Sequence, residues 1–87
     1  MLIMGRTERF KRAYKKLTRE EQERAKKAIL LLAENPRHPS LFVKKMQGAG
    51  GIWEARYSRG GRITFAMDGG AVVLRNIGEH DATLNRP

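Results

Sequence analysis

Cysteine is absent from this chain of 87 residues, and so is any long apolar run. The first absence excludes disulfides, thiolate nucleophiles and cysteine-ligated metals. The second excludes a membrane-spanning helix, which needs about 20 apolar residues. The opening segment Met1–Met4 is also too short for a signal peptide. We therefore expect a soluble, cytoplasmic protein with no membrane partner.

Histidine is almost as scarce, with only His38 and His80 present. Neither occurs with the spaced carboxylates that a metal site requires, so we expect no metal and no other cofactor. Glycine gathers at 48–51, but no Lys-Ser/Thr pair and no helix follow it. This excludes a phosphate-binding loop and indicates a turn.

Acidic residues are half as common as basic ones. Nine Asp and Glu stand against eighteen Lys and Arg, which gives a formal charge of +9. This balance favours nucleic acid, an acidic protein or an anionic membrane surface as a partner. The membrane is least favoured, because the basic residues do not lie on one long helix with a bulky apolar face.

The first third of the chain has the pattern of two helices. Thr7 is a suitable N-cap, and apolar residues then recur at the spacing of one helical face. Thr18 and Glu21 have the spacing of a capping box that starts a second helix, and Asn35-Pro36 ends it. The pattern predicts a helical hairpin over residues 8–34. The apolar stripe of its first helix consists of Phe10, Ala13, Tyr14 and Leu17.

The last third has the pattern of strands. Residues 52–57, 62–67 and 71–77 are rich in β-branched and aromatic residues and are separated by glycine. Residues 1–5 and 41–43 are candidates for further short strands. Helices followed by a run of strands predict an α+β fold, with the helical hairpin on one face of a small antiparallel sheet. The length predicts a single domain over residues 1–87.

The register between the first two predicted strands follows from their alternation. Apolar residues must face apolar residues across the pair, which requires a loop of odd length. The three residues Ser58-Arg59-Gly60, with the glycine in the left-handed conformation, meet this requirement. This register places Arg56 opposite Arg62 and Glu54 opposite Thr64. Tyr57 then lies on the apolar face.

The second turn adds a third strand to the same face. Either the first two or the last two residues of Asp68-Gly69-Gly70 can form it. Both choices place Leu74 on the apolar face and Arg75 on the polar face, opposite Arg62 or Thr64. Arginines that share a sheet face can simply be solvated. A phosphate-rich ligand explains their convergence better, because the guanidinium donates in pairs and stays charged.

A histidine follows the last predicted strand, in the segment Gly78-Glu79-His80-Asp81. Next to the arginine face, His80 is a candidate general acid or base. His38 lies in a proline-rich loop and is not a candidate.

These pieces, in this order, resemble the RelE/ParE superfamily of toxins from toxin–antitoxin modules. The resemblance spans nearly the whole chain and is carried by 45–48, 52–56, 61–63 and 78–81. It implies a microbial ribonuclease-like fold and an antitoxin partner. In the RelE branch it implies ribosome-dependent cleavage of mRNA, and the members called YoeB and HigB look closer in chemistry than RelE itself, which relies on lysines where this chain has Glu54 and Arg56.

The resemblance also implies roles for the polar residues. Glu54 is the candidate base for the ribose 2′-OH, and His80 is the candidate acid for the leaving oxygen. The candidates for stabilising the transition state are Arg56, Arg62 and Arg75. In an alternative assignment, Glu54 holds an arginine in place and His80 is the base. Many relatives carry a tyrosine near the C-terminus where this chain has Leu84.

The remaining cations are candidates for docking on ribosomal RNA through salt-sensitive contacts. They are Lys11, Arg12, Lys15, Lys16, Lys26, Lys27, Lys44 and Lys45. Two other functions stay open. One is that of the ParE branch, which inhibits DNA gyrase and is not a nuclease, and the other is a non-catalytic RNA-binding module.

Overall fold

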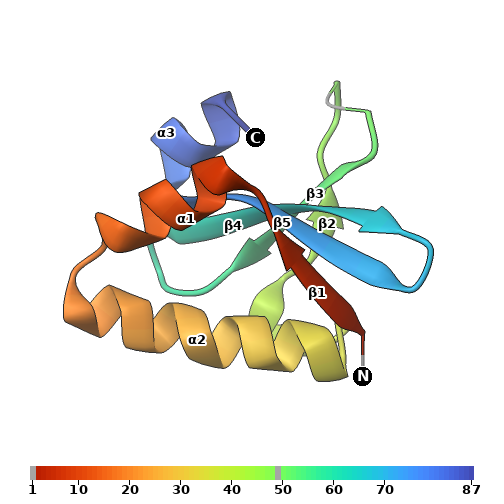
Figure 1. Ribbon diagram of the computed structural model, residues 1–87, viewed down its shortest axis with the longest axis horizontal. Coiled ribbons are helices and arrows are strands. Elements are labelled where there is room, and N and C mark those ends of the chain that lie inside the picture. The colour runs from red at the N-terminus through yellow and green to blue at the C-terminus, as the bar shows by residue number, and fades with distance from the viewer. Residues whose placement is uncertain (1, 49) are drawn as a thin grey trace.

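The computed structural model describes residues 2–48 and 50–87, which form three α-helices, one short 3₁₀ helix and a five-stranded sheet (Figure 1). In chain order these elements are β1 (Ile3–Arg6), α1 (Glu8–Lys15), α2 (Arg19–Glu34), η1 (Pro39–Leu41), β2 (Lys44–Lys45), β3 (Ile52–Arg56), β4 (Gly61–Asp68), β5 (Ala71–Glu79) and α3 (His80–Asn85).

The sheet is mixed, in the order β1-β5-β4-β3-β2. The three strands β3, β4 and β5 form the expected antiparallel meander. The expectation of a purely antiparallel sheet was wrong, because β1 pairs with β5 in parallel, Ile3 beside Ala71. The strand expected at 1–5 therefore exists at 3–6, and Met1 lies outside the described residues.

Both helices begin at the expected caps. The Thr7 side chain accepts a hydrogen bond from the backbone N–H of Phe10 at 3.1 Å. Thr18 and Glu21 form the reciprocal capping box, and α2 ends before Asn35. Each such cap stabilises a helix by about 1 kcal/mol. The capping residues in the sequence were therefore sufficient to predict where these two helices begin.

The arrangement of the helices differs from the expected N-terminal hairpin, because the chain starts with β1. The start of α1 is attached to the sheet by two hydrogen bonds. The Thr7 backbone N–H donates to the carbonyl oxygen of Leu74, and the Thr7 hydroxyl donates to the carbonyl oxygen of Arg75, both at 3.0 Å. Consequently α1 packs along β5, while α2 lies below the sheet (Figure 1).

The core lies between α2 and one face of the sheet. Its largest fully buried side chains come from α1, α2, η1 and the meander. They are Phe10, Leu32, Leu41, Ile63, Phe65, Val72 and Leu74. Full burial of one such side chain stabilises the fold by about 1.5–3 kcal/mol. Tyr57 lies on this face, as predicted, and is 7% exposed.

A β-bulge lets two residues of β5 share the core although they are three positions apart. Regular alternation would place Leu74 and Ile77 on opposite faces. In the structure Leu74 pairs with Phe65 and Ile77 pairs with Ile63, so that two residues of β5 lie opposite one residue of β4. Burial of Ile77 explains the irregularity, and Arg75 lies within it.

The two turns of the meander have the expected lengths. Tyr57 and Gly61 close the first turn through a backbone hydrogen bond of 3.3 Å, which leaves the three expected residues in the loop. Gly60 is not left-handed, contrary to expectation, because a Ser58–Gly61 turn reverses the chain without a positive φ. The second turn is Gly69-Gly70, with φ +62° at Gly69.

The segment between the helices and the meander departs most from expectation. The expected strand at 41–43 does not form, because His38 caps η1 by accepting from the backbone N–H of Ser40. Phe42 then turns the chain, and the strand starts at Lys44. The glycine-rich turn at 48–51 includes Ala49, which lies outside the described residues.

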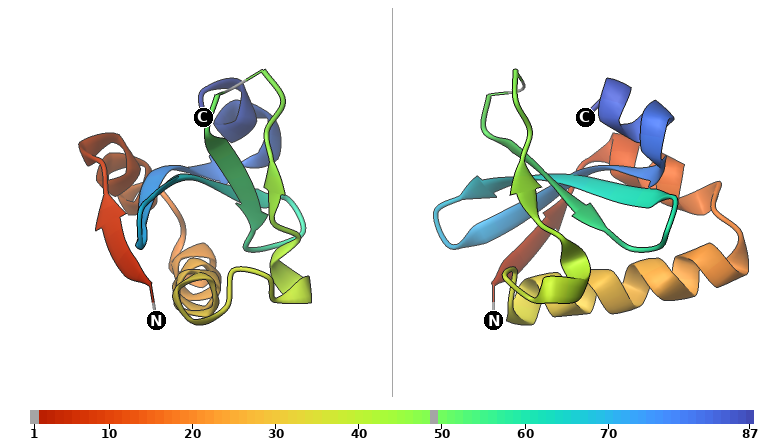
Figure 2. Two further views of the ribbon diagram at one scale, coloured as in Figure 1. Left: turned by 90° about the vertical axis from the view of Figure 1, so that its right-hand side faces the viewer. Right: turned by 180° about the vertical axis from the view of Figure 1, so that it is seen from behind.

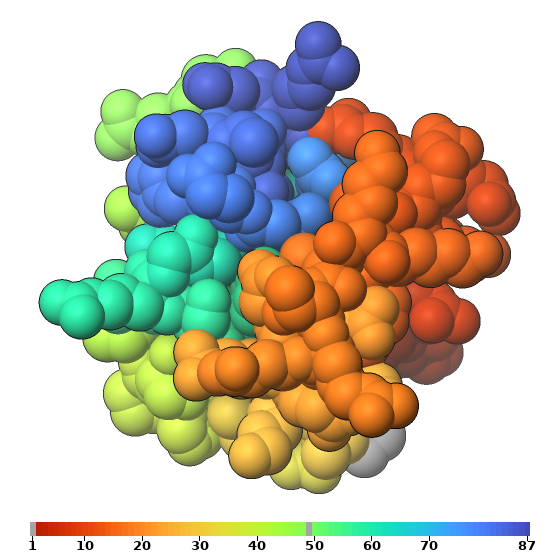
Figure 3. All heavy atoms as spheres, turned by 90° about the vertical axis from the view of Figure 1, so that its left-hand side faces the viewer, coloured from red at the N-terminus to blue at the C-terminus, as the bar shows by residue number. Residues whose placement is uncertain are grey.

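The second face of the sheet is covered in part by α3. This helix packs against β4 and β5 on the side opposite α2 (Figure 2). The backbone N–H of His80 donates to the carbonyl oxygen of Gly60 at 2.8 Å. This bond joins the start of α3 to the β3–β4 loop, and Figure 3 shows the two side by side.

Candidate functional site

The polar face of the sheet has the register expected from the sequence on β3 and β4. Arg56 lies opposite Arg62, and Glu54 lies opposite Thr64. On its other side Glu54 lies opposite Lys44 of β2. The expected face is therefore present, with a lysine added at its edge.

Glu54 and Arg62 form the centre of this face. Arg62 Nε lies 3.9 Å from Glu54 Oε1, and the two side chains are only 12% and 10% exposed. The Arg62 guanidinium also donates to the carbonyl oxygen of Gly61 at 2.9 Å. A pair of opposite charges that is this buried loses several kcal/mol if one partner is removed. The pair thus holds both side chains in place on this face.

Within the described residues, the Arg56 guanidinium forms no hydrogen bond with Glu54. It lies instead over the ring of Phe42, 4.3 Å from the centroid. Its Nε is buried and has no hydrogen-bond partner among the described residues.

The predicted position of Arg75 was wrong. Arg75 does not pair with Arg62 or Thr64, because the β-bulge removes it from the register. Its Nε donates to the backbone oxygen of Pro87 at 3.1 Å, and Thr64 Oγ1 donates to the same oxygen at 3.0 Å. The structure thus brings Arg75 to the same face, through the last residue of the chain.

His80 is the first residue of α3 and its side chain is 46% exposed. Its Nδ1 lies 2.9 Å from Asp81 Oδ1. Because an ionised carboxylate only accepts, Nδ1 carries the proton in this contact, and Nε2 is the ring atom available for proton transfer. The backbone bond to Gly60 places His80 beside the loop whose carbonyl groups bind Arg62.

Sequence reasoning missed three contributors to this face. Thr64 is fully buried and provides a hydroxyl, and Asn76 donates to the carbonyl oxygen of Arg86 at 2.9 Å. Asp81 orients His80. Thr64 could have been found from the register alone, because it was expected opposite Glu54. Leu84 lies in α3 and is partly buried.

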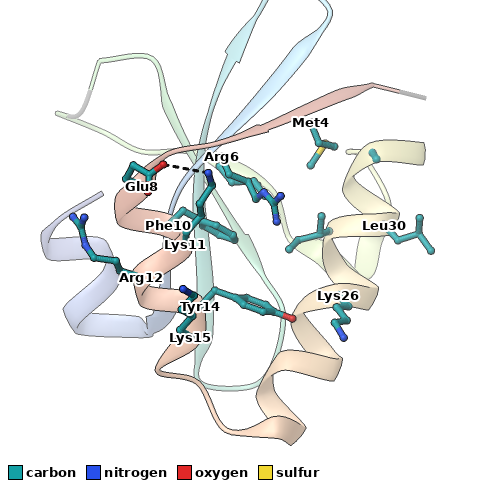
Figure 4. A pocket seen from close by; sticks show the side chains of 13 residues that line it. Met4, Arg6, Glu8, Phe10, Lys11, Arg12, Tyr14, Lys15, Lys26 and Leu30 are labelled. Carbon is teal, nitrogen blue, oxygen red and sulfur yellow. Dashed lines mark hydrogen bonds and ion pairs between the residues drawn. The ribbon is translucent and has the colours of Figure 1, made fainter.

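Four of the expected docking cations lie elsewhere, around an apolar pocket between β1, α1 and α2 (Figure 4). Its volume is about 800 Å³, and Tyr14, Ile29 and Leu30 are among its apolar lining residues. The cations at this pocket are Arg6, Lys11, Arg12, Lys15 and Lys26. Its one acidic residue, Glu8, is already paired with Lys11 at 3.2 Å.

The other expected cations are scattered. Lys16 follows α1 as its C-cap, Lys27 lines a separate pocket with η1, and Lys44 and Lys45 form the exposed edge strand β2. Of these eight cations only Lys44 lies opposite Glu54, since Lys45 lies opposite Trp53. The structure therefore does not gather the eight expected docking cations on one surface.

The ionisation of Tyr57 is shifted by its surroundings. Burial, with a further effect from the Glu21 carboxylate, raises the pKa of its hydroxyl to about 12. The hydroxyl has no hydrogen-bond partner among the described residues. It lies on the core side and is no part of the candidate site.

Within residues 2–48 and 50–87, no group of three His, Asp or Glu side chains could hold a metal ion. No helix in the same residues has the length and apolar character needed to cross a bilayer.

Solved structures resemble this one over most of the chain. The isolated RelE toxin of E. coli covers 93% of this chain and 86% of its own, with a TM-score of 0.72 and 21% identity. The chain has the RelE-like toxin fold. E. coli YafQ shares this fold with a TM-score of 0.79 and 14% identity, covering 94% of this chain and 97% of its own.

A third solved structure with the RelE-like fold is a complex. The RelB–RelE antitoxin–toxin complex from Methanococcus jannaschii matches with a TM-score of 0.74 and 16% identity, covering 90% of this chain and 92% of the other. No family model and no curated protein matches the sequence.

Proposed function

We propose that this protein is the toxin of a toxin–antitoxin pair and that it cleaves mRNA on the ribosome. One observation carries the proposal: Glu54 and Arg62 lie together, largely buried, on the polar face of the sheet and next to the loop that binds His80. The RelE-like fold supports the toxin class.

Cleavage of RNA without a metal requires a general base, a general acid and cations that bind the phosphate. The ribose 2′-oxygen attacks the adjacent phosphorus and the bond from phosphorus to the 5′-oxygen breaks. Glu54 accepts the proton of the 2′-OH, and His80 Nε2 donates a proton to the leaving 5′-oxygen. Each transfer contributes about 10²–10⁴ to the rate. The products are a 2′,3′-cyclic phosphate and a free 5′-OH.

The arginines stabilise the negative charge that develops on the phosphate oxygens. Arg62 is already fixed by Glu54 and Gly61. Arg56 has buried, unpartnered Nε, and Arg75 donates to a backbone oxygen of Pro87 that a phosphate oxygen would replace. A phosphate oxygen that takes the place of the Pro87 oxygen would accept directly from Arg75.

The alternative assignment uses the same residues. The Glu54 carboxylate lies within 3.9 Å of Arg62, so it would serve to orient this guanidinium, and His80 would be the base. Separate pH–rate profiles of Glu54 and His80 variants distinguish the two assignments.

The decisive experiment assays the purified protein with programmed ribosomes and maps the cleavage sites on the mRNA. We expect cleavage by the wild type. Arg62→Ala and His80→Ala should abolish cleavage and growth arrest while antitoxin binding persists. His38→Asn and Arg37→Ala are matched controls, since the first retains an acceptor for the η1 cap and the second removes an exposed arginine. Wild-type activity in both site variants would refute the site.

The two rival functions predict other outcomes. A gyrase inhibitor would produce DNA damage after induction and no cuts in mRNA. A non-catalytic RNA-binding module would bind RNA with an affinity that His80→Ala does not change, and would produce no fragments. The fold is common to all these functions and cannot choose among them.

The proposed antitoxin has a suitable surface in the pocket between α1 and α2. An apolar floor with five cations around it fits an acidic amphipathic segment. Leu30 is 56% exposed at this pocket. The antitoxin-bound RelE of the archaeal complex supports a partner of this kind. Leu30→Glu should weaken antitoxin binding and leave cleavage intact, with exposed Ile3→Glu as the comparison.

A further inference from the structure

Phe42 is an unusual residue in this chain. It is the one residue other than glycine with a positive φ among those the structure describes, at φ 48° and ψ 43°. This left-handed conformation is unfavourable for a residue with a Cβ and is normally left to glycine or asparagine. The aromatic ring is also 60% exposed. Neither backbone preference nor burial explains a phenylalanine here.

The Phe42 ring is contacted by one cation and is otherwise largely exposed. The Arg56 guanidinium lies 4.3 Å from the ring centroid on one side. A cation over one face of an aromatic ring fixes the ring and leaves its other face for stacking. Arg56 in turn has a buried Nε without a partner. Phe42 and Arg56 therefore form a platform with its aromatic part exposed to solvent.

A shallow pocket of about 490 Å³ surrounds this platform. Its lining includes four cations, Arg24, Lys27, Arg56 and Arg59, and no acidic residue. Arg24 is paired with Glu20 at 2.9 Å, whereas Lys27 and Arg59 have no ion pair within the described part of the chain. An exposed aromatic ring among cations is the arrangement that binds single-stranded nucleic acid, by stacking a base and holding its phosphates.

We propose that Phe42 and Arg56 form a base-stacking subsite for single-stranded RNA, with Lys27 and Arg59 as its phosphate contacts. Any of the four bases can stack on Phe42, so the subsite adds affinity without reading sequence. The left-handed backbone at Phe42 keeps the ring at the surface.

The subsite deepens the proposed function and rests on it for its place in catalysis. Arg56 lies opposite Arg62 on the neighbouring strand and two residues from Glu54. A nucleotide stacked on Phe42 therefore extends toward the Glu54–Arg62 pair through a shared arginine.

The test measures binding of a short single-stranded oligoribonucleotide, with 2′-O-methyl groups that prevent cleavage, by fluorescence anisotropy. Phe42→Leu should weaken binding by about 5- to 150-fold, the loss typical of one stacked base. Phe42→Trp should retain or improve it. Phe42→Gly should lose affinity like the leucine variant and yet melt no lower than wild type, because glycine adopts the left-handed backbone freely. Exposed Met67→Leu is the control.

The outcomes separate the subsite from the proposed function. Unchanged affinity in Phe42→Leu overturns the subsite even if ribosome-dependent cleavage is present. Aromatic-dependent affinity confirms it even if the wild type cleaves nothing. If Phe42→Leu leaves RNA affinity unchanged but weakens antitoxin binding, the ring is a protein contact and the subsite is refuted. A lower melting temperature in Phe42→Gly assigns the ring a structural role and also counts against it.

Discussion

The two faces of the sheet differ in the side chains that they present and in the contacts that these side chains make. The core face is filled by aliphatic and aromatic side chains, and a bulge in β5 interrupts the alternation so that Ile77 is buried too. The polar face holds a buried ion pair, a guanidinium with an unpartnered Nε, and a backbone oxygen shared by Thr64 and Arg75. The difference indicates that the core face is organised for stability and the polar face for a charged ligand.

The largest expected effect concerns activity on the polar face. Glu54→Gln keeps the size of the side chain but removes its charge, so cleavage should fall by about 10²–10⁴ if Glu54 is the base. The variant should also be less stable, because the buried Arg62 loses its charged partner, so the rate is expressed per amount of folded protein. The rate is measured on programmed ribosomes, with exposed Glu23→Gln as the control. An unchanged rate would remove Glu54 from the chemistry.

The core face should respond through stability. Phe65 is 1% exposed, and Phe65→Ala should reduce the free energy of unfolding by about 3–5 kcal/mol. Met67 on the same strand is 43% exposed, and Met67→Ala should change it by less than about 0.5 kcal/mol. Denaturant titration measures both. Similar losses at the two positions would contradict the distinction between core and surface along β4.

A third variant tests the packing at the β3–β4 loop, which connects two strands of the sheet. A Cβ added to Gly61 would lie 2.6 Å from Cε2 of Tyr57 and 2.6 Å from Oγ of Ser58. Gly61→Ala should therefore cost about 1–3 kcal/mol. Gly60 has open space and no positive φ, so Gly60→Ala should be nearly neutral. Equal thermal shifts in the two variants would refute this packing.

The smallest effect is on the pH dependence of stability. The pKa of Tyr57 is about 12 in the folded protein against 10.0 for an ordinary tyrosine. The unfolded chain therefore loses this proton first, and the stabilisation, complete below pH 10, is lost as pH rises toward 12. Tyr57→Phe should flatten this part of the curve. Tyr14→Phe is the matched control, and a curve for Tyr57→Phe that falls as steeply as wild type would refute the assignment.

Local signals in the sequence were enough for the elements and the first register. Caps at Thr7 and Thr18 fixed the helix starts, and the alternation from Trp53 to Phe65 fixed the pairing of Arg56 with Arg62. The bulge was not predictable from the turns, because it depends on the burial of Ile77 in a core made by distant segments. The position of Arg75 was wrong for the same reason.

The sequence predicted which residues belong to the candidate site better than it predicted the contacts that these residues make. The polar face and the place of His80 near it agree with the expectation, whereas the roles of these residues stay proposals. The Pro87 contact, the Asp81 contact and the Phe42 platform each need a fold that brings distant residues together. A one-dimensional pattern contains no signal for them. Phe42 in particular was expected in a strand.

The parallel pairing of β1 with β5 has a consequence for how the protein is made. Thr7 binds Arg75 across 68 residues, and β1 has no other strand beside it. Such distant pairing is slow to form, since the connecting chain must first close a large loop. During synthesis the first strand must wait until β5 has left the ribosome. The completed five-stranded sheet therefore forms only after β5 has been synthesised.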